Sequence, residues 1–341
     1  MSGLPKIESN CNKIINLFYN AITSRLLITG IRLHVFDQLE KAASADEVAW
    51  VLSLHPENTL HMLDALCACE LAEKKDGKYK NTPEAGELLV SGKPAYLGDW
   101  LTLADEDLGR CLENLPELIR SGPDVLPQTN HMNSERYCER FTASHAASSL
   151  AGIARDMARE IAIVSGFTDC RRMLDLGGGP GINAMAVAEM NDHVTATVID
   201  RPEIIKFTER YIRDYGFENQ VTAVAGDYLK DSIGSGYDMI MITDSLYYSD
   251  QEVDGVLKKC YAALNSGGFF VGIHAVLTHE RTRPAFMVLG MLPDAVCDQG
   301  VLPDQGFLER ALRRCNFENL SSKMISVGGS PMEMNVGYKN N

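Results

Sequence analysis

The stretch RRMLDLGGGPGINAMAVAEM, residues 171–190, is the feature that most constrains what this chain can fold into. It predicts a buried strand from Met173 to Leu176, then a glycine-rich turn, then a helix that begins near Gly181. The glycines at 177–179 let the backbone approach a ligand closely, because a side chain there would collide with it. A strand, a glycine turn and a helix in this order indicate an α/β domain that binds its ligand at the carboxyl ends of parallel strands.

The same alternation continues to the end of the chain. Further strands are predicted in HVTATVID, VTAVAGDY, YDMIMIT and GGFFVGIHAVL, with helices in RPEIIKFTERYIRDYG and DQEVDGVLKKCYAAL between them. The last segment, LSSKMISVGGSPMEMNVGYK, predicts two strands joined by a turn at residues 328–331. We therefore predict a Rossmann-like domain over residues 169–341, with a mostly parallel sheet closed by an antiparallel C-terminal hairpin.

The first 120 residues have a different, helical character. Ser44 before two acidic residues is a typical helix N-cap, HPENTLHMLDALCACEL predicts a second helix, and AEKKDGKYKNT predicts a short hairpin at Asp76-Gly77. An earlier helix is predicted, with Gly30 as a break, from the spacing of Ile14, Phe18, Ile22, Leu26 and Leu33. These elements predict an all-helical winged-helix domain at residues 1–120, followed by a helical connector at 121–168 that contributes to the substrate pocket.

Charge decides what such a winged helix can bind. The chain has a formal net charge of −14, and residues 1–100 hold ten Lys or Arg against thirteen Asp or Glu. The helix that would read DNA bases, PENTLHMLDALCACEL, carries no Lys or Arg, so we expect no nucleic-acid partner. A dimerisation module is the better interpretation, and a DNA-binding regulator is a minor alternative.

The cysteine content and the lengths of the apolar runs indicate the cellular compartment of the protein. The nine cysteines form no CxxC pair, and their odd number argues against a closed disulfide framework. The apolar runs VLSLH and FFVGIHAVL are far shorter than the roughly 20 residues of a membrane span, and the N-terminus lacks a signal-peptide pattern. We expect a cytoplasmic protein that does not bind a membrane.

Two acidic residues follow strands at positions where a nucleoside would be held. Asp200 ends the second strand about twenty residues after the glycine turn, where a carboxylate reaches ribose hydroxyls in NAD or S-adenosylmethionine sites. Asp227 and Tyr228 end the third strand and suit an adenine, which needs an acceptor for its amine and a ring for stacking. The glycines follow a GxGxG register, which departs from the GxGxxG of dinucleotide folds.

These motifs, together with YYSDQE and LKKCYAALNSGGFFV, resemble the S-adenosylmethionine-dependent O-methyltransferases that include plant phenolic, hydroxyindole and bacterial polyketide-tailoring enzymes. The segments RLHVFDQLEK and LDALCACELAEKKDGKYKNTPEAGELLVSGKPAYLGD are similar to that family's dimerisation winged helix. The resemblance implies a homodimer that methylates a small aromatic or heterocyclic acceptor, most simply at a hydroxyl, without a metal. It also implies a cofactor site at Asp175, Gly177, Gly179, Asp200, Gly226, Asp227, Tyr228 and Thr243.

The catalytic base is the point at which this sequence departs from the family. An alignment on SDQE without gaps puts Leu246 where the family has a histidine, whereas a one-residue gap would put Tyr247 there. His274 occupies a position where the family often has a glutamate, so we expect that the imidazole has been relocated to it. Tyr247, which can orient a substrate oxygen, and His145, just before the predicted α/β domain, are the other catalytic candidates.

The acceptor pocket is expected to be lined by adaptable side chains, although a plain helix core is an equally good interpretation of them. Because the usual histidine is replaced by Leu246, the alternative activities are C-, N- or S-methylation, or a reaction other than methylation on the same cofactor. The expected substrate-binding residues are Phe141, His145, Phe286, Met287 and Met291.

Overall fold

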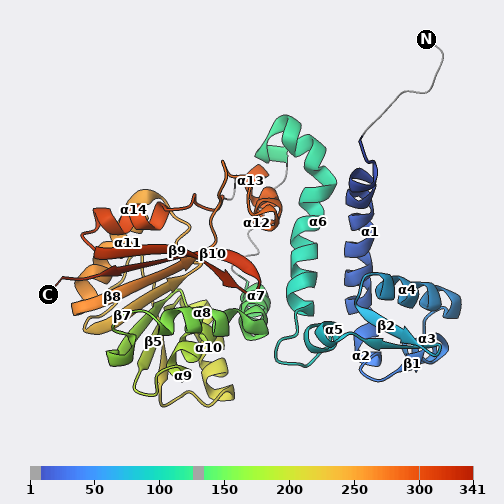
Figure 1. Cartoon of the computed structure of the whole chain (residues 1–341), viewed down its shortest axis with the longest axis horizontal. Coiled ribbons are helices and arrows are strands. Elements are labelled where there is room, and N and C mark those ends of the chain that lie inside the picture. Colours follow the sequence, from blue (N-terminus) through green and yellow to red (C-terminus); the bar gives the residue numbers. More distant parts are fainter. Residues whose placement is uncertain (1–8, 126–133, 299, 341) are drawn as a thin grey trace, which may run out of the picture. The chain divides into compact units, whose positions relative to one another are not determined.

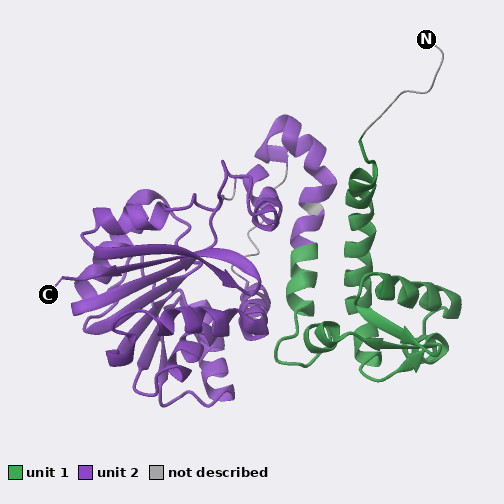
Figure 2. Ribbon diagram, viewed as in Figure 1, with its two compact units in different colours: residues 1–105 green, residues 106–341 purple. Residues whose placement is uncertain are grey.

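The computed structural model describes residues 9–125, 134–298 and 300–340. The chain forms two compact units, residues 1–105 and residues 106–341 (Figure 2). The division falls inside helix α6 (Gly98–Ser121). The boundaries expected at residues 120 and 168 stay predictions, and parts of those segments, residues 1–8 and 126–133, lie outside the described residues.

The first unit is a winged helix (Figure 1). Its helices are α1 (Asn12–Arg32), α2 (Val35–Gln38), α3 (Ala45–Leu52), α4 (Pro56–Ala68) and α5 (Pro83–Leu88). Its strands β1 (Ala43–Ser44), β2 (Ala72–Lys75) and β3 (Lys78–Asn81) pair antiparallel in the order β1-β3-β2. The domain is therefore not all-helical, because the predicted hairpin recruits β1 into a small sheet. Ser44 caps α3, as predicted, and the structure adds a complete capping box with Glu47.

Gly30 does not break the first helix, contrary to the prediction. α1 runs without interruption to Arg32. A Cβ atom at position 30 would lie 2.9 Å from the ring of Phe36, which is fully buried in this unit's core. The glycine therefore serves close packing of α2 against α1 rather than a turn.

The exposed part of α1 is strongly apolar. Ile14, Leu17, Phe18 and Ile22 are each more than half exposed, and Phe18 reaches 74%. By length and composition alone the helix could cross a membrane, with a mean hydropathy of 1.3 in its most apolar window. The expectation that no segment is long enough for a span is therefore corrected for this helix.

The second unit contains a seven-stranded sheet in the order β6-β5-β4-β7-β8-β10-β9. The first five strands in this order are parallel, and β10 pairs antiparallel with both β8 and β9, as predicted. The chain order reverses between β4 and β7, so the carboxyl ends of these strands flank the topological switch point, where α/β folds bind ligands. The strands are β4 (Arg172–Leu176), β5 (Thr195–Asp200), β6 (Val221–Ala225), β7 (Tyr237–Thr243), β8 (Leu264–His274), β9 (Glu318–Val327) and β10 (Ser330–Tyr338).

Helices cover both faces of this sheet (Figure 1). α8 (Ala154–Ala162), α9 (Ile182–Glu189) and α10 (Pro202–Asp214) share one apolar core with the sheet, and α11 (Asp250–Ala263) and α14 (Phe307–Arg314) share the other. Alternate residues of a strand enter the two cores, since Met173 belongs to the first and Leu174 to the second. The remaining helices are α7 (Glu135–Ser148), α12 (Ala285–Gly290), α13 (Leu292–Val296), the π-helix η3 (Ser149–Ile153) and the 3₁₀ turns η1 (Pro123–Val125) and η4 (Phe167–Asp169).

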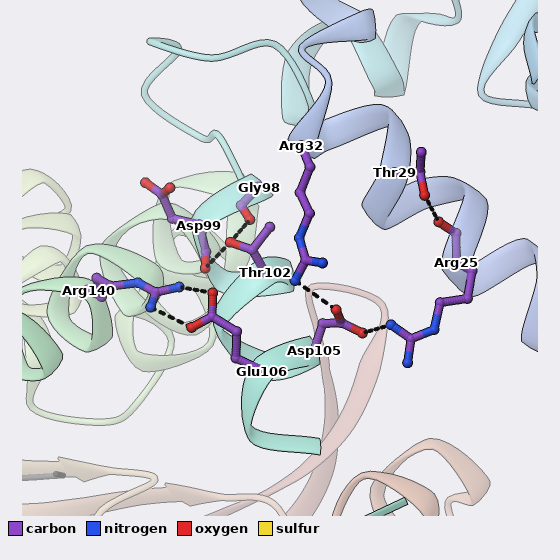
Figure 3. A network of polar contacts seen from close by, with 9 residues as sticks. All are labelled: Arg25, Thr29, Arg32, Gly98, Asp99, Thr102, Asp105, Glu106 and Arg140. Carbon is purple, nitrogen blue, oxygen red and sulfur yellow. Dashed lines mark hydrogen bonds and ion pairs between the residues drawn. The ribbon is translucent and has the colours of Figure 1, made fainter. Parts of the chain in front are cut away.

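Two successive acidic residues of α6 each make ion pairs (Figure 3). Asp105 accepts hydrogen bonds from Arg25 at 2.7 Å and from Arg32 at 3.0 Å, which ties α6 to α1 within the first unit. In the second unit, Glu106 accepts from both terminal nitrogens of Arg140 on α7, at 2.7 and 3.3 Å. Paired guanidinium contacts of this kind fix geometry as well as contribute energy.

Candidate functional site

A cavity of about 670 Å³ opens at the carboxyl ends of β4, β5, β6 and β7, wholly within the second unit. Its wall comes from the glycine turn after β4, from the residues that follow the other three strands, and from α7 and η3. The lining residues include Phe141, His145, Gly177, Gly179, Asp200, Gly226, Asp227, Tyr228, Thr243, Asp244, Tyr247 and Tyr248. The wall thus contains every expected cofactor residue except Asp175.

The glycine turn forms a cradle that only glycine can build. Gly177 and Gly179 have φ angles of +69° and +54°, in the left-handed region that other residues rarely adopt. A Cβ atom at Gly177 would lie 2.7 Å from the Ser245 Oγ, and one at Gly178 would lie 2.5 Å from an Asp175 oxygen. Glycine at 177 and 178 therefore lets the turn pack closely against Ser245 and Asp175, while residues 177–179 line the cavity without side chains.

Asp200 links this turn to the cavity. One carboxylate oxygen accepts a hydrogen bond from the Gly179 N–H at 2.9 Å, and the other accepts from the Arg201 N–H at 2.7 Å. Burial raises the pKa of Asp200, and these two hydrogen bonds oppose that rise. Each oxygen keeps acceptor capacity, so the carboxylate can receive two ribose hydroxyls while it orders the turn.

Asp175 lies beneath the turn rather than on the cavity wall. Its side chain is fully buried, and within the described part of the chain neither carboxyl oxygen has a hydrogen-bond partner. Burial raises the pKa of Asp175 to about 8, and the nearby charge of Asp200 adds to the rise. The carboxyl group is therefore mostly protonated at neutral pH and supports the turn from behind.

Asp227 and Tyr228 lie on the wall beyond β6. The Tyr228 hydroxyl donates to the Ser245 carbonyl at 2.8 Å, and burial raises the pKa of this phenol. Asp227 accepts from the Leu229 N–H at 3.0 Å and from Lys230 at 2.7 Å, and the lysine lowers the pKa of Asp227. The lysine side chain is largely exposed, so this ion pair holds the carboxylate only weakly.

Leu246 and His274 both lie away from the cavity. Leu246 is 1% exposed and packs in the apolar core beneath α11 and α14. His274 is fully buried, pairs across the sheet with Glu333, and packs edge-on against the rings of Tyr247 and Phe307. Among the described residues neither of its ring nitrogens has a hydrogen-bond partner, and burial lowers the pKa of His274 to about 3. The position of His274 does not favour the expected role of its imidazole as the catalytic base, because β10 and α14 separate the ring from solvent.

We expect His274 to make stability depend on pH. Its pKa is about 3 in the folded chain and near 6.5 when exposed, so the unfolded state takes up a proton first as the pH falls below 6.5. At pH 5 this costs about 2 kcal/mol of stability, which urea unfolding at pH 5 and pH 7.5 would measure. His274→Gln removes the titration, so it should flatten that difference; an equally steep loss in the variant would contradict the assignment.

Phe141 and His145 lie one helical turn apart on α7 and both line the cavity, with their ring centroids 4.3 Å apart. His145 keeps accessible surface toward the cavity, yet the crowding around its ring lowers its pKa, so it is neutral near pH 7. The other expected substrate residues do not reach this wall. Phe286 is 63% exposed, and Met287 and Met291 pack instead against a separate small apolar cluster.

Asp244 was not expected and belongs to the wall. It is the first residue after β7 and has a φ of +46°. Its Oδ1 accepts hydrogen bonds from the Tyr247 hydroxyl at 2.5 Å and from the Ala275 N–H at 2.8 Å. Burial raises the pKa of Asp244, although both hydrogen bonds oppose the rise. Its place at a strand end, like that of Asp200, is the signal that could have identified it.

Two protein-family models match the chain. The O-methyltransferase domain model matches residues 129–300, and the O-methyltransferase dimerisation domain model matches residues 15–91. The chain is 26% identical over 300 residues to 3-hydroxy-5-methyl-1-naphthoate 3-O-methyltransferase of Streptomyces sahachiroi, covering 85% of this chain and 86% of the relative. It is also 26% identical to L-tyrosine C(3)-methyltransferase of Streptomyces lavendulae, over 92% of this chain and 88% of that one.

Solved structures share the fold. Human N-acetylserotonin methyltransferase in complex with S-adenosylmethionine superimposes with a TM-score of 0.80 at 22% identity, covering 99% of this chain and all of that one. The pyocyanin biosynthetic protein PhzM gives the same TM-score at 18% identity, over 96% and 98% of the two chains. With the two domain models, the expected fold and cofactor are confirmed, and the chain belongs to the S-adenosylmethionine-dependent O-methyltransferase family.

Proposed function

We propose that this methyltransferase acts on the hydroxyl oxygen of a small aromatic or heterocyclic acceptor. The observation that carries the proposal is that a single cavity joins the glycine turn and Asp200 to an aromatic wall of Phe141, Tyr247 and Tyr248. Flat rings bind well between aromatic side chains, and the polar groups at strand ends would orient them. The relative named as a naphthoate O-methyltransferase supports an acceptor of this class.

The residues of the wall fit S-adenosylmethionine. The cradle at Gly177 would admit the methionine portion, Asp200 would accept from the ribose, and Asp227 with Tyr228 would frame the adenine. When bound, the sulfonium supplies an activated methyl group. The chain's own task is then to hold and orient the acceptor, which can contribute roughly 7–11 kcal/mol, against a factor of about 10²–10⁴ from a base. Loss of the usual histidine at Leu246 is therefore compatible with activity.

A second candidate is methylation of carbon or nitrogen. It is favoured by the buried Leu246 and by two relatives, named as L-tyrosine C(3)-methyltransferase and as N,N-dimethyltransferase OxyT. The Asp244 carboxylate on the wall would accept a hydrogen bond, and then the proton, from a neutral amine as well as from a hydroxyl.

Methyl transfer from labelled S-adenosylmethionine to a panel of acceptors distinguishes the two candidates. We expect label in the ether fraction with 1-naphthol or N-acetylserotonin, and less label with 1-naphthylamine, which has no hydroxyl. Label on nitrogen or ring carbon would replace the hydroxyl proposal by the second candidate. Turnover of the cofactor without label in any acceptor would contradict both.

The dimerisation-domain match includes Leu17, Phe18 and Ile22, three exposed apolar residues of α1, and we propose that this surface forms a homodimer. Light scattering should give about twice 37.5 kDa. Replacing Phe18 and Ile22 together by Glu should give monomers at micromolar concentration, since two charges would be buried against apolar side chains. Ile163→Glu is the control, because Ile163 is equally exposed but lies in the other unit. A double variant that stays dimeric would exclude this surface.

A further inference from the structure

The described wall of the cavity offers several ionisable groups, and most are already engaged. Asp200 orders the glycine turn, and Asp227 pairs with Lys230. The burial that raises the pKa of the Tyr247 and Tyr228 phenols keeps both protonated, so they can donate but are poor bases. Asp244 and His145 are therefore the two groups that could receive a proton from an acceptor.

The contacts of Asp244 hold its carboxylate in a fixed orientation. Oδ1 is anchored by the Tyr247 hydroxyl from its own loop and by the Ala275 N–H just after β8. The Asp244 N–H also donates to the Ile273 carbonyl at 3.0 Å, so the backbone is tied to the same strand. Within the described residues no hydrogen bond reaches Oδ2, although the side chain has accessible surface inside the recessed cavity. A carboxylate with one anchored oxygen and one available oxygen is arranged to accept a proton from a bound molecule.

We propose that Asp244 is a catalytic residue that accepts the acceptor's proton through Oδ2, that Tyr247 is its positioning residue, and that the acceptor is therefore a neutral O–H compound. This inference rests on the proposed O-methylation. It assigns the missing base to the loop after β7, two residues before Leu246, rather than to an imidazole.

The step balances without a further reactant. The acceptor's O–H bond breaks and its proton goes to the Asp244 carboxylate. The freed electron pair forms the new oxygen–carbon bond as the carbon–sulfur bond breaks and leaves a neutral thioether. One positive and one negative charge are thereby neutralised, so no separated charge remains in a cavity where charges are poorly solvated. Burial raises the pKa of Asp244, which makes it a stronger proton acceptor than an exposed carboxylate.

The backbone at Asp244 decides which variant tests this. A φ of +46° is tolerated by Asp and Asn and strains most other residues. In Asp244→Ala, a loss of activity from backbone strain could therefore not be told apart from a loss caused by the missing carboxylate. Asp244→Asn keeps the conformation and the Oδ1 acceptor but cannot take up the proton. Asp298→Asn is the matched control, since Asp298 is exposed, has a φ of +54° and is not on the cavity wall.

The kinetic test compares an oxygen and a sulfur acceptor. With 1-naphthol we expect Asp244→Asn to lower kcat by roughly 10²-fold or more with cofactor affinity intact, while Asp298→Asn is unchanged. With 2-naphthalenethiol, which ionises without help near pH 8, the loss should be less than about tenfold. Tyr247→Phe should lower kcat for 1-naphthol by less than Asp244→Asn. If His145→Gln lowers kcat and Asp244→Asn does not, the base is His145 and the proposal is wrong.

A binding measurement tests the same contact without methyl transfer. 4-Nitrophenol titrates near neutral pH and its phenolate absorbs in the visible, so its absorbance reports the bound form in the presence of S-adenosylhomocysteine. In the wild type the carboxylate should favour the neutral phenol, and in Asp244→Asn the bound pKa should fall by about one unit or more. Other ionisable groups near this site are common to both proteins: His145, Asp200, Arg201, Asp227, Tyr228, Tyr247, Tyr248 and His274.

The two measurements separate the inference from the proposed function. A shifted 4-nitrophenol pKa without any labelled ether would place Asp244 at the acceptor while the O-methylation proposal fails. The same bound pKa in the wild type and in Asp244→Asn would overturn the inference, even if 1-naphthol is methylated.

Discussion

Asp200→Ala is expected to weaken S-adenosylmethionine binding by about 1.5–3 kcal/mol, roughly a 10- to 150-fold loss of affinity. Two effects contribute, because the carboxylate would accept the ribose hydroxyls and also holds the Gly179 N–H at 2.9 Å. Without it, the turn loses an anchor and the ribose loses its charged acceptor. Titration calorimetry with S-adenosylmethionine measures the change directly.

Asp214→Ala is the control, since Asp214 lies at the exposed end of α10 and away from the cavity wall. Its affinity should match that of the wild type. An unchanged affinity in Asp200→Ala would remove Asp200 from the cofactor site and with it the placement of the ribose.

Gly178→Ala should destabilise the second unit by about 3 kcal/mol and abolish cofactor binding. The added Cβ would lie 2.5 Å from an Asp175 oxygen and 2.7 Å from a Val198 methyl group. Both neighbours are fully buried, so neither can move away cheaply, and overpacking of this kind typically costs about 1–3 kcal/mol. The upper end of that range is expected because the Asp175 carboxyl is fully buried and has no hydrogen-bond partner among the described residues. Thermal unfolding with and without S-adenosylmethionine is the measurement.

Gly255→Ala provides the comparison within the same unit. Gly255 lies inside α11 with nothing within 4 Å of an added Cβ, so alanine should be neutral or stabilise by up to about 1 kcal/mol. If Gly178→Ala unfolds at the same temperature as Gly255→Ala, the turn is not packed as described.

The parts of this molecule that sequence predicts well are those set by local pattern. The strands of the sheet are short apolar runs, and the turn at Gly177 follows from glycine chemistry, so both were predictable. Asp200 and Asp227 were expected at the site because they lie at strand ends, and both line the cavity. The hairpin at the C-terminus was predicted for the same reason, from two alternating segments around a glycine pair.

What sequence did not predict depends on which way a side chain points. Asp244 directly follows β7, and His274 ends the neighbouring strand β8. Asp244 nevertheless lines the cavity, whereas β10 and α14 bury His274. Gly30 was expected to break α1, but its missing side chain instead leaves room for the ring of Phe36 from the next helix. Phe286 suited a pocket by composition, but α12 leaves its ring outside this cavity. Each difference is set by tertiary packing, which overrides local preference.

A crystal structure with S-adenosylhomocysteine and 1-naphthol tests most directly whether one cavity holds both cofactor and acceptor. We predict the ribose hydroxyls on Asp200, the adenine beside Asp227 and Tyr228, and the naphthol oxygen within hydrogen-bond distance of Asp244, about 3 Å. The account would be contradicted by a nucleoside bound elsewhere, or by a naphthol oxygen that contacts another base and leaves Asp244 paired only with Tyr247 and Ala275.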